Sequence, residues 1–229
     1  MIEQKFPTME PDMLAAVESM LGKDRAHVVS EIEKLDAVWS CSPSLGTPLY
    51  GRDAVDEPFR GWSIPRIEAI YLYSLVRFLK PKVGVEIGTS FGYSTIWLAS
   101  AMQGSGGHLH TCEVVSEKVE MARRFLDRAS ASNVTLHNCE AQNLCRSWSQ
   151  PIDLLFMDAD AENYMTYWQH LLPHFQANTL VVVDNALDRA LQLRPFMDKL
   201  SSDAGLDCWT APIGHGILHI QSNLAGRTP

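Results

Sequence analysis

The sequence predicts an α/β domain built on a mainly parallel β-sheet. From residue 83 onward, short apolar or β-branched runs alternate with stretches of helical periodicity. The runs read VGVEI, HLHTCE, VTLHN, IDLLFM and TLVVV. Strand–helix alternation at this spacing is typical of right-handed βαβ units. The last stretch, LDCWTAPIGHGILHIQ, reads as two strands around a turn, which predicts an antiparallel hairpin at the sheet edge and seven strands in all.

The helices follow from apolar residues that recur at helical spacing. Two helices are expected within the first 35 residues, and a further one over 66–79. Between the strands we expect helices over 93–102, 116–129, 162–172 and 189–200. Proline and glycine punctuate residues 41–65, which predicts a long loop of the kind that forms lids or binding segments. We therefore divide the chain into a helical cap with a substrate loop (1–60) and a main domain (61–229) within one structural unit.

Composition narrows the class of protein. The chain has 229 residues, of which 46% are hydrophobic and 20% charged, as in globular domains. The 19 basic residues against 27 acidic ones give a net charge of −8, which disfavours binding along a nucleic-acid backbone. No apolar stretch is long enough for a membrane span, and the first residues lack the pattern of a secretory signal. Five scattered cysteines without a CxxC pair fit reduced thiols, so we expect a cytoplasmic protein.

The first strand ends in a glycine-containing turn that leads into a helix. Gly88 and Gly92 in Glu-Ile-Gly-Thr-Ser-Phe-Gly let the chain turn tightly and approach a ligand closely. Glu113 ends the next strand, 25 residues after Gly88, where a carboxylate is placed to accept hydrogen bonds from ribose hydroxyls. Taken alone, each feature also fits an ordinary turn or a solvated strand end. Together they favour a nucleoside-type ligand at the carboxyl ends of the strands.

Polar side chains also follow the fourth and fifth predicted strands. Asp158 follows IDLLFM, and Asp184 and Asn185 follow three valines. Adjacent parallel strands bring these oxygens to one sheet edge, where they suit Mg²⁺ in the first place, or Mn²⁺ or Ca²⁺. The alternative is that such residues merely cap the following turns. For Asp160, N-capping of the next helix is a strong competitor.

At these residues the chain resembles the class I S-adenosylmethionine-dependent methyltransferases. More narrowly, it resembles the metal-dependent O-methyltransferases of the caffeoyl-CoA and catechol group. The motifs VEIGTSFGYSTIWLA, CE, DLLFMDADAENY, VVVDN and PIGHGI stand in the order and approximate spacing of that group, over roughly residues 62–220. The resemblance implies a Rossmann-like class I methyltransferase fold with helices on both faces of the sheet. It also implies a homodimer.

The resemblance further implies a role for each motif residue. The methionine part of the cofactor would be lined by Glu86, Gly88, Thr89 and Ser94, with Gly92 in the same loop. Glu113 would hold the ribose and Ala141 would meet the adenine through its backbone. Trp62 and Ser63 lie where the family's N-terminal segment closes over the cofactor. The divalent cation would be bound by Asp158, Asp184 and Asn185. Asp158 would act in catalysis as well, and Asp160 would face the acceptor.

Two departures from the family pattern concern the proton that must leave the acceptor. Ala161 stands where the family usually has a lysine that is treated as a base. The hairpin turn reads Gly214-His215-Gly216, where the family usually has aspartate between the glycines. An imidazole titrates near neutral pH, so His215 is a candidate replacement base. The simpler alternative is a histidine on a surface turn.

The expected activity is methyl transfer from S-adenosylmethionine to a hydroxyl of a small molecule with vicinal oxygens, such as a catechol or another polyhydroxylated metabolite. The acceptor itself is not defined by the sequence. Two alternatives stay open: methylation of a hydroxylated uridine in transfer RNA, and a cofactor-binding homologue without catalytic activity. The net charge weighs against the first, and the intact set of metal ligands weighs against the second.

Overall fold

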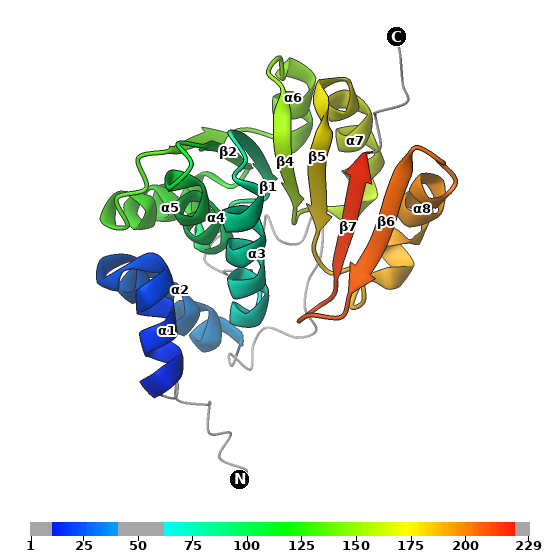
Figure 1. Cartoon of the computed structure of the whole chain (residues 1–229). Helices are drawn as coiled ribbons and strands as arrows, with labels where there is room; N and C mark the ends of the chain where they lie inside the picture. Colours follow the sequence, from blue (N-terminus) through cyan, green and yellow to red (C-terminus); the bar gives the residue numbers. More distant parts are fainter. Residues whose placement is uncertain (1–10, 41–61, 223–229) are drawn as a thin grey trace.

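The computed structural model describes residues 11–40 and 62–222, and it contains the predicted sheet. Seven strands pair in the order β3-β2-β1-β4-β5-β7-β6, and β7 alone among them runs in the opposite direction (Figure 1). The strands are β1 (Val83–Ile87), β2 (His108–Glu113), β3 (Val134–Asn138), β4 (Ile152–Met157), β5 (Phe175–Val183), β6 (Leu206–Ala211) and β7 (Ile217–Ser222). The parallel sheet with an antiparallel C-terminal hairpin is therefore confirmed.

Helices cover both faces of the sheet, as predicted (Figure 1). One face carries α3 (Arg66–Leu79), α4 (Tyr93–Gln103) and α5 (Ser116–Arg128), with α1 (Pro11–Leu21) and α2 (Lys23–Ser40) packed outside them. The other face carries α6 (Ala141–Ser147), α7 (Tyr164–Leu171) and α8 (Ala190–Ser201), with short 3₁₀ turns at Ala161–Asn163 and Leu172–His174. Side chains alternate between the two cores along each central strand, because successive residues of a strand point to opposite faces.

The observed elements differ from the predicted ones in three places. Helix α6 was not predicted, because its seven residues are too few to show a periodic pattern. Strand β5 begins at Phe175, four residues before the predicted run, and its added residues are mostly polar and exposed. The predicted helix over 162–172 is divided between a 3₁₀ turn and α7. The predicted substrate loop and the domain boundary after residue 60 lie outside the described residues.

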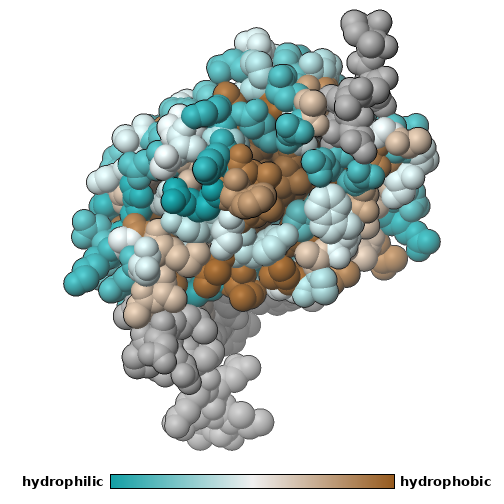
Figure 2. All heavy atoms as spheres, in the orientation of Figure 1, coloured by the Kyte–Doolittle hydropathy of each residue, from teal (hydrophilic) through white to brown (hydrophobic). Residues whose placement is uncertain are grey.

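Apolar surface gathers near the middle of the face drawn in Figure 2, between hydrophilic regions. Helix α3 contributes exposed apolar side chains to the surface, among them Ile67 and the 83% exposed Phe78.

Within residues 11–40 and 62–222, no helix combines the length and the apolar character that crossing a bilayer requires.

The order of the strands reverses where β1 meets β4. Consecutive connections run outward from β1 through β2 to β3 on one side, and through β4 to β5 on the other. In such sheets, ligands bind in the crevice at the carboxyl ends of the strands beside this reversal. The backbone N–H of Asp158 donates to the Ile87 carbonyl oxygen at 2.9 Å, and that of Asp184 donates to the Met157 carbonyl oxygen at 3.0 Å. Gly88, Asp158 and Asp184 therefore follow three neighbouring strands, side by side.

Gly88 is the position where this arrangement requires a glycine. Its φ is +102°, a backbone conformation that other residues rarely adopt. A Cβ added at Gly88 would lie 2.0 Å from the backbone oxygen of Asp158, so the loop after β1 and the end of β4 are in direct contact. The close approach of these two strand ends depends on the missing side chain.

We expect Gly88→Ala to lower the free energy of unfolding by about 2 kcal/mol or more, because the new methyl group displaces the backbone at Asp158. Gly106→Ala is the matched control. Gly106 also has a positive φ, of +67°, but its added Cβ would meet nothing within 4 Å, so only the backbone conformation is penalised, at about 1 kcal/mol. Chemical denaturation of both variants measures the difference. Equal losses would contradict the proposed contact.

Candidate active site

A cavity of about 440 Å³ opens at the carboxyl ends of β1, β2 and β4. This volume is typical of small-molecule sites. Its wall includes nine of the residues that the sequence assigned to the site, namely Trp62, Ser63, Gly88, Thr89, Ser94, Glu113, Ala141, Asp158 and Asp160. The structure therefore brings most of the predicted cofactor-binding residues around one space.

Glu113 joins the loops that follow β1 and β2. One carboxylate oxygen accepts a hydrogen bond from the backbone N–H of Ser90 at 2.9 Å. The other oxygen accepts from the backbone N–H groups of Val114 and Val115, at 3.0 Å each. These three bonds fix the carboxylate at the cavity wall. Each carboxylate oxygen can accept more than one hydrogen bond, so the group can also accept bonds from a molecule in the cavity.

Glu86 and Gly92 are not among the residues that line the cavity. Glu86 is fully buried and accepts hydrogen bonds from the hydroxyls of Ser94 at 2.6 Å and Thr95 at 2.5 Å. Burial raises the pKa of Glu86. Gly92 has a φ of +87° and directly precedes α4. Glu86 therefore holds the first turn of α4, Gly92 ends the loop that leads into it, and neither residue lines the cavity.

Asp160 lines the cavity and is held by its neighbours. Its carboxylate accepts a hydrogen bond from the Tyr167 hydroxyl at 2.7 Å and another from the Asn163 side-chain amide. Burial raises the pKa of Tyr167, and so does its bond to Asp160, which keeps that hydroxyl protonated as the donor. Asp160 occupies the N-cap position of the following 3₁₀ turn, as the alternative expected, but its side chain makes no capping bond there.

Two cavity-lining cations were missing from the sequence prediction. Lys118 is buried on the apolar face of α5, between the turn after β2 and the cavity. The sequence did contain a sign of this burial, because Lys118 lies on the same helix face as the buried residues Ala122 and Phe125. Arg189 lines the cavity near the start of α8, and its charge opposes part of the rise that burial causes in the pKa values of Asp158 and Asp184. Sequence spacing gave no sign of that proximity.

The strand-end residues predicted to bind a metal lie together. The Asn185 side-chain amide donates to Oδ2 of Asp184 at 2.8 Å and to Oδ1 of Asp158 at 3.4 Å. Burial raises the pKa of both aspartates, and the charge of Asp184 raises that of Asp158 further. Asn185 holds this position with a φ of +63°, a conformation that asparagine tolerates better than most residues.

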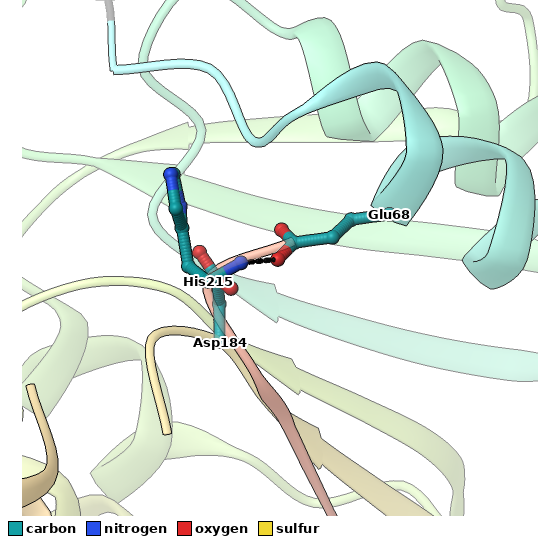
Figure 3. Close-up of side chains that lie close together, drawn as sticks. All are labelled: Glu68, Asp184 and His215. Atoms are coloured by element: carbon teal, nitrogen blue, oxygen red, sulfur yellow. Dashed lines mark hydrogen bonds between the residues drawn. The ribbon is translucent and has the colours of Figure 1, made fainter. Parts of the chain in front are cut away.

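A third acid, Glu68 of α3, joins this group and was not predicted. Glu68 is 1% exposed, and its carboxylate lies beside Asp184 and the turn that carries His215 (Figure 3). Burial, and next the charge of Asp184, raise the pKa of Glu68 to about 9. The signal in the sequence was an acid within the apolar pattern IEAIYLYSLVRFL.

The acid group fits a divalent cation. Asp184 is 3% exposed, and among the described residues no donor reaches its Oδ1 atom. Buried carboxylates that lie together are unfavourable unless a positive charge or hydrogen bonds compensate them. The donor set of carboxylate and amide oxygens matches a hard cation, provided that Asn185 turns its amide oxygen toward the ion.

His215 lies at the edge of the acid group and is not among the residues that line the cavity. Its backbone N–H donates to Glu68, and its ring nitrogen Nε2 is 3.9 Å from Oδ2 of Asp188. The side chain is 39% exposed. It therefore combines a position on a surface turn with proximity to the buried acids.

Comparisons with known proteins agree with this geometry. Residues 85–186 match the family model of a methyltransferase domain. The fold is that of a class I methyltransferase. The chain is 34% identical over 122 residues to a catechol O-methyltransferase of Niastella koreensis, covering 51% of the chain and 55% of the relative. It is 31% identical over 147 residues to a catechol O-methyltransferase of Mycobacterium tuberculosis, covering 63% and 66%.

The structural likeness extends further along the chain than the sequence likeness. The crystal structure of cofactor-bound Rv0187 from MTB superposes with a TM-score of 0.68 and 25% identity, and covers 96% of this chain and 99% of that one. In contrast, the sequence matches span just over half and just under two thirds of the two curated relatives. The sequence likeness to the catechol O-methyltransferases thus covers part of each protein, whereas the likeness of the fold covers nearly the whole chain.

Asp36 connects the N-terminal helices to the cavity. It lies on α2 and accepts hydrogen bonds from the hydroxyl and the backbone N–H of Ser63, which lines the cavity. Burial raises the pKa of Asp36 from its usual 3.8 to about 6, against the opposing effects of Ser63 and Lys118. The folded chain therefore holds a proton at pH 5 that the unfolded chain has released.

We expect this proton to give the fold a measurable pH dependence. Since the pKa is higher in the folded state, the contribution of Asp36 is fully present below pH 4 and is lost as the pH rises through about 6, by up to about 3 kcal/mol. In Asp36→Asn that loss is absent. Urea denaturation of both proteins between pH 4 and pH 8 measures the difference, and a constant difference across this range would contradict it.

Proposed function

We propose that the protein transfers a methyl group from S-adenosylmethionine to a hydroxyl oxygen of a small molecule, with a divalent cation bound beside the cofactor. Asp158 carries the proposal. It lines the cavity and also belongs to the buried acid group, so one side chain adjoins both spaces. A cofactor in the cavity and an acceptor at the acid group would therefore lie next to each other.

The cavity wall suits the parts of S-adenosylmethionine. The Glu113 carboxylate would accept hydrogen bonds from the ribose hydroxyls, and the backbone at Ala141 would meet the adenine. The loop at Gly88 and Thr89 would hold the methionine part, with Gly92 ending that loop and Glu86 holding the first turn of the helix that follows. Trp62 and Ser63 would close one side.

The acid group would hold the cation through Asp158, Asp184 and Asn185. A divalent cation bound there supplies Lewis acidity, which lowers the pKa of an acceptor hydroxyl near neutral pH. Ala161 cannot take a proton, so a base at that position is absent. Asp160, which Tyr167 fixes at the cavity wall, would face the acceptor and orient its hydroxyl.

Much of the rate enhancement in such a reaction comes from positioning. Holding two reactants in line contributes roughly 7–11 kcal/mol toward the barrier. In this chain the direct contact of Gly88 with Asp158 fixes the distance between the two binding spaces. An acceptor with vicinal oxygens would place two donors on one cation, which fits catechols and polyhydroxylated metabolites. The homodimer and the cytoplasmic location remain predictions.

Glu113→Ala tests the cofactor part of the proposal. We expect the Kd for S-adenosylhomocysteine to rise by about tenfold or more, because the ribose loses its carboxylate partner. Glu117→Ala is the matched control, since Glu117 is an exposed acid in the first turn of α5. Isothermal titration calorimetry gives both values. An unchanged Kd in Glu113→Ala would contradict the assignment of the cavity to this cofactor.

Asp184→Ala tests the cation part. Activity on a panel of catechols, flavonoids and sugars should fall by roughly 10²-fold or more, whereas the affinity for S-adenosylhomocysteine stays within about threefold. The exposed Asp198 of α8 provides the control variant Asp198→Ala. Full activity of the natural protein in the presence of a chelator would rule out the cation. The same activity assay, with transfer RNA in place of the small molecules, tests the alternative that the acceptor is a nucleic acid.

A further inference from the structure

We propose that Glu68 and His215 are two additional ligands of the cation site, and that the His215 imidazole makes the site prefer transition-metal ions such as Co²⁺, Ni²⁺ and Zn²⁺ over Mg²⁺. The inference rests on the proposed function, since it concerns the same cation. It adds a carboxylate from α3 and a ring nitrogen from the β6–β7 turn to the oxygens at the strand ends.

The three residues come from separate elements and lie close together (Figure 3). One carboxylate oxygen of Glu68, one of Asp184 and one ring nitrogen of His215 all lie within 4.8 Å of one another. Two ligands of one ion are separated by at most about twice the bond length, or roughly 4.0–4.6 Å for bonds of 2.0–2.3 Å. Side-chain shifts of less than about 1 Å therefore bring all three atoms to a single ion.

The burial of this group indicates that a positive charge belongs there. Glu68 and Asp184 are 1% and 3% exposed, and Oδ1 of Asp184 meets no donor within the described part of the chain. Two neighbouring buried carboxylates with an unsatisfied oxygen are unfavourable by themselves. His215 adjoins the group and is itself partly exposed to solvent.

The backbone holds the three ligands in place before any ion binds. A Cβ at Gly214 would lie 2.2 Å from Oε1 of Glu68, so the glycine lets the turn reach the carboxylate. The backbone N–H of His215 donates to the same carboxylate. The N–H groups of Leu187 and Asp188 donate to the His215 carbonyl oxygen at 3.0 and 3.1 Å, which binds this turn to the segment after β5.

The nitrogen ligand decides which ions the site prefers. Mg²⁺ takes oxygen ligands and retains its water molecules, whereas imidazole suits later first-row ions. A site made of carboxylates alone discriminates weakly between Mg²⁺ and the later first-row ions. The selectivity of this site therefore depends on the residue at position 215, and the affinity for every divalent ion depends on Glu68.

Co²⁺ binding to the full chain tests the proposal without reference to activity. We expect His215→Asn to weaken Co²⁺ binding by about tenfold or more and to leave the Mg²⁺ affinity within about twofold. The shifted imidazole N–H resonance of the Co²⁺-loaded protein should disappear with the same substitution. Glu68→Gln should weaken the binding of both ions. Calorimetry gives the affinities, and proton NMR gives the resonance.

Two control variants distinguish this site from Co²⁺ binding elsewhere on the chain. Asp188→Asn removes the exposed partner of the His215 ring but no proposed ligand, so Co²⁺ binding should stay unchanged. His137→Asn removes one member of the His110–His137 pair, whose ring nitrogens are 3.3 Å apart on β2 and β3. If the nitrogen resonance depends on His137 and not on His215, the ion binds at that pair and the proposal is overturned.

A further variant keeps the test decisive if His215→Asn does not fold. His215→Asp replaces the nitrogen by an oxygen ligand and should shift the preference toward Mg²⁺ by about tenfold or more. If Co²⁺ binding is lost in Asp184→Ala but unaffected by changes at Glu68 and His215, the additional ligands are wrong and the proposed cation site stands. If Asp184→Ala also leaves binding unchanged, the proposed cation dependence fails as well.

Discussion

The contact between the loop after β1 and the end of β4 is the constraint on which the rest of the site depends. Strands β1 and β4 are neighbours in the sheet, and the strand order reverses between them. Gly88 then lies directly against the Asp158 backbone, which no larger residue permits. On one side of this contact the loops line the cavity that we propose for the cofactor, and on the other side the strand ends form the acid group. The distance between the two spaces is set by backbone packing and does not depend on flexible side chains.

The acid group shows how a fold accommodates charges that are unfavourable in its interior. Asp184 and Glu68 are buried and Asp158 is half-buried, and removal from water raises the pKa of each. Arg189 and the Asn185 amide compensate part of this unfavourable burial. Such a group is poorly explained as a contribution to stability, because replacing buried charges by apolar residues is often neutral or stabilising. A cation-binding function gives a physical reason for keeping three carboxylates in one place.

The N-terminal helices belong to the site. Helix α2 supplies Asp36 to the Ser63 segment at the cavity wall, and α3 supplies Glu68 to the acid group. Helix α3 therefore lies between the two spaces, with its first turn at the acid group and its preceding residues at the cavity. Asp36 and Glu68 therefore link these two helices to the two spaces by direct contact. The net charge of −8 also takes on a more specific meaning, since several acids adjoin the spaces proposed for a sulfonium cofactor and a metal ion.

The sequence by itself determined the order of the strands and helices, the hairpin, and the row of polar residues at the strand ends. These features depend on periodicity and on turn residues, which act over a few neighbouring positions. It also placed several cavity residues, such as Gly88, Glu113 and Asp158, because they stand at the strand ends. Only the tertiary structure decided that Glu86 lies behind the glycine loop and that Lys118 and Arg189 face the cavity. It alone placed Glu68 against the turn of His215, 147 residues further along the chain. Such contacts arise from the packing of whole elements, so no local pattern determines them.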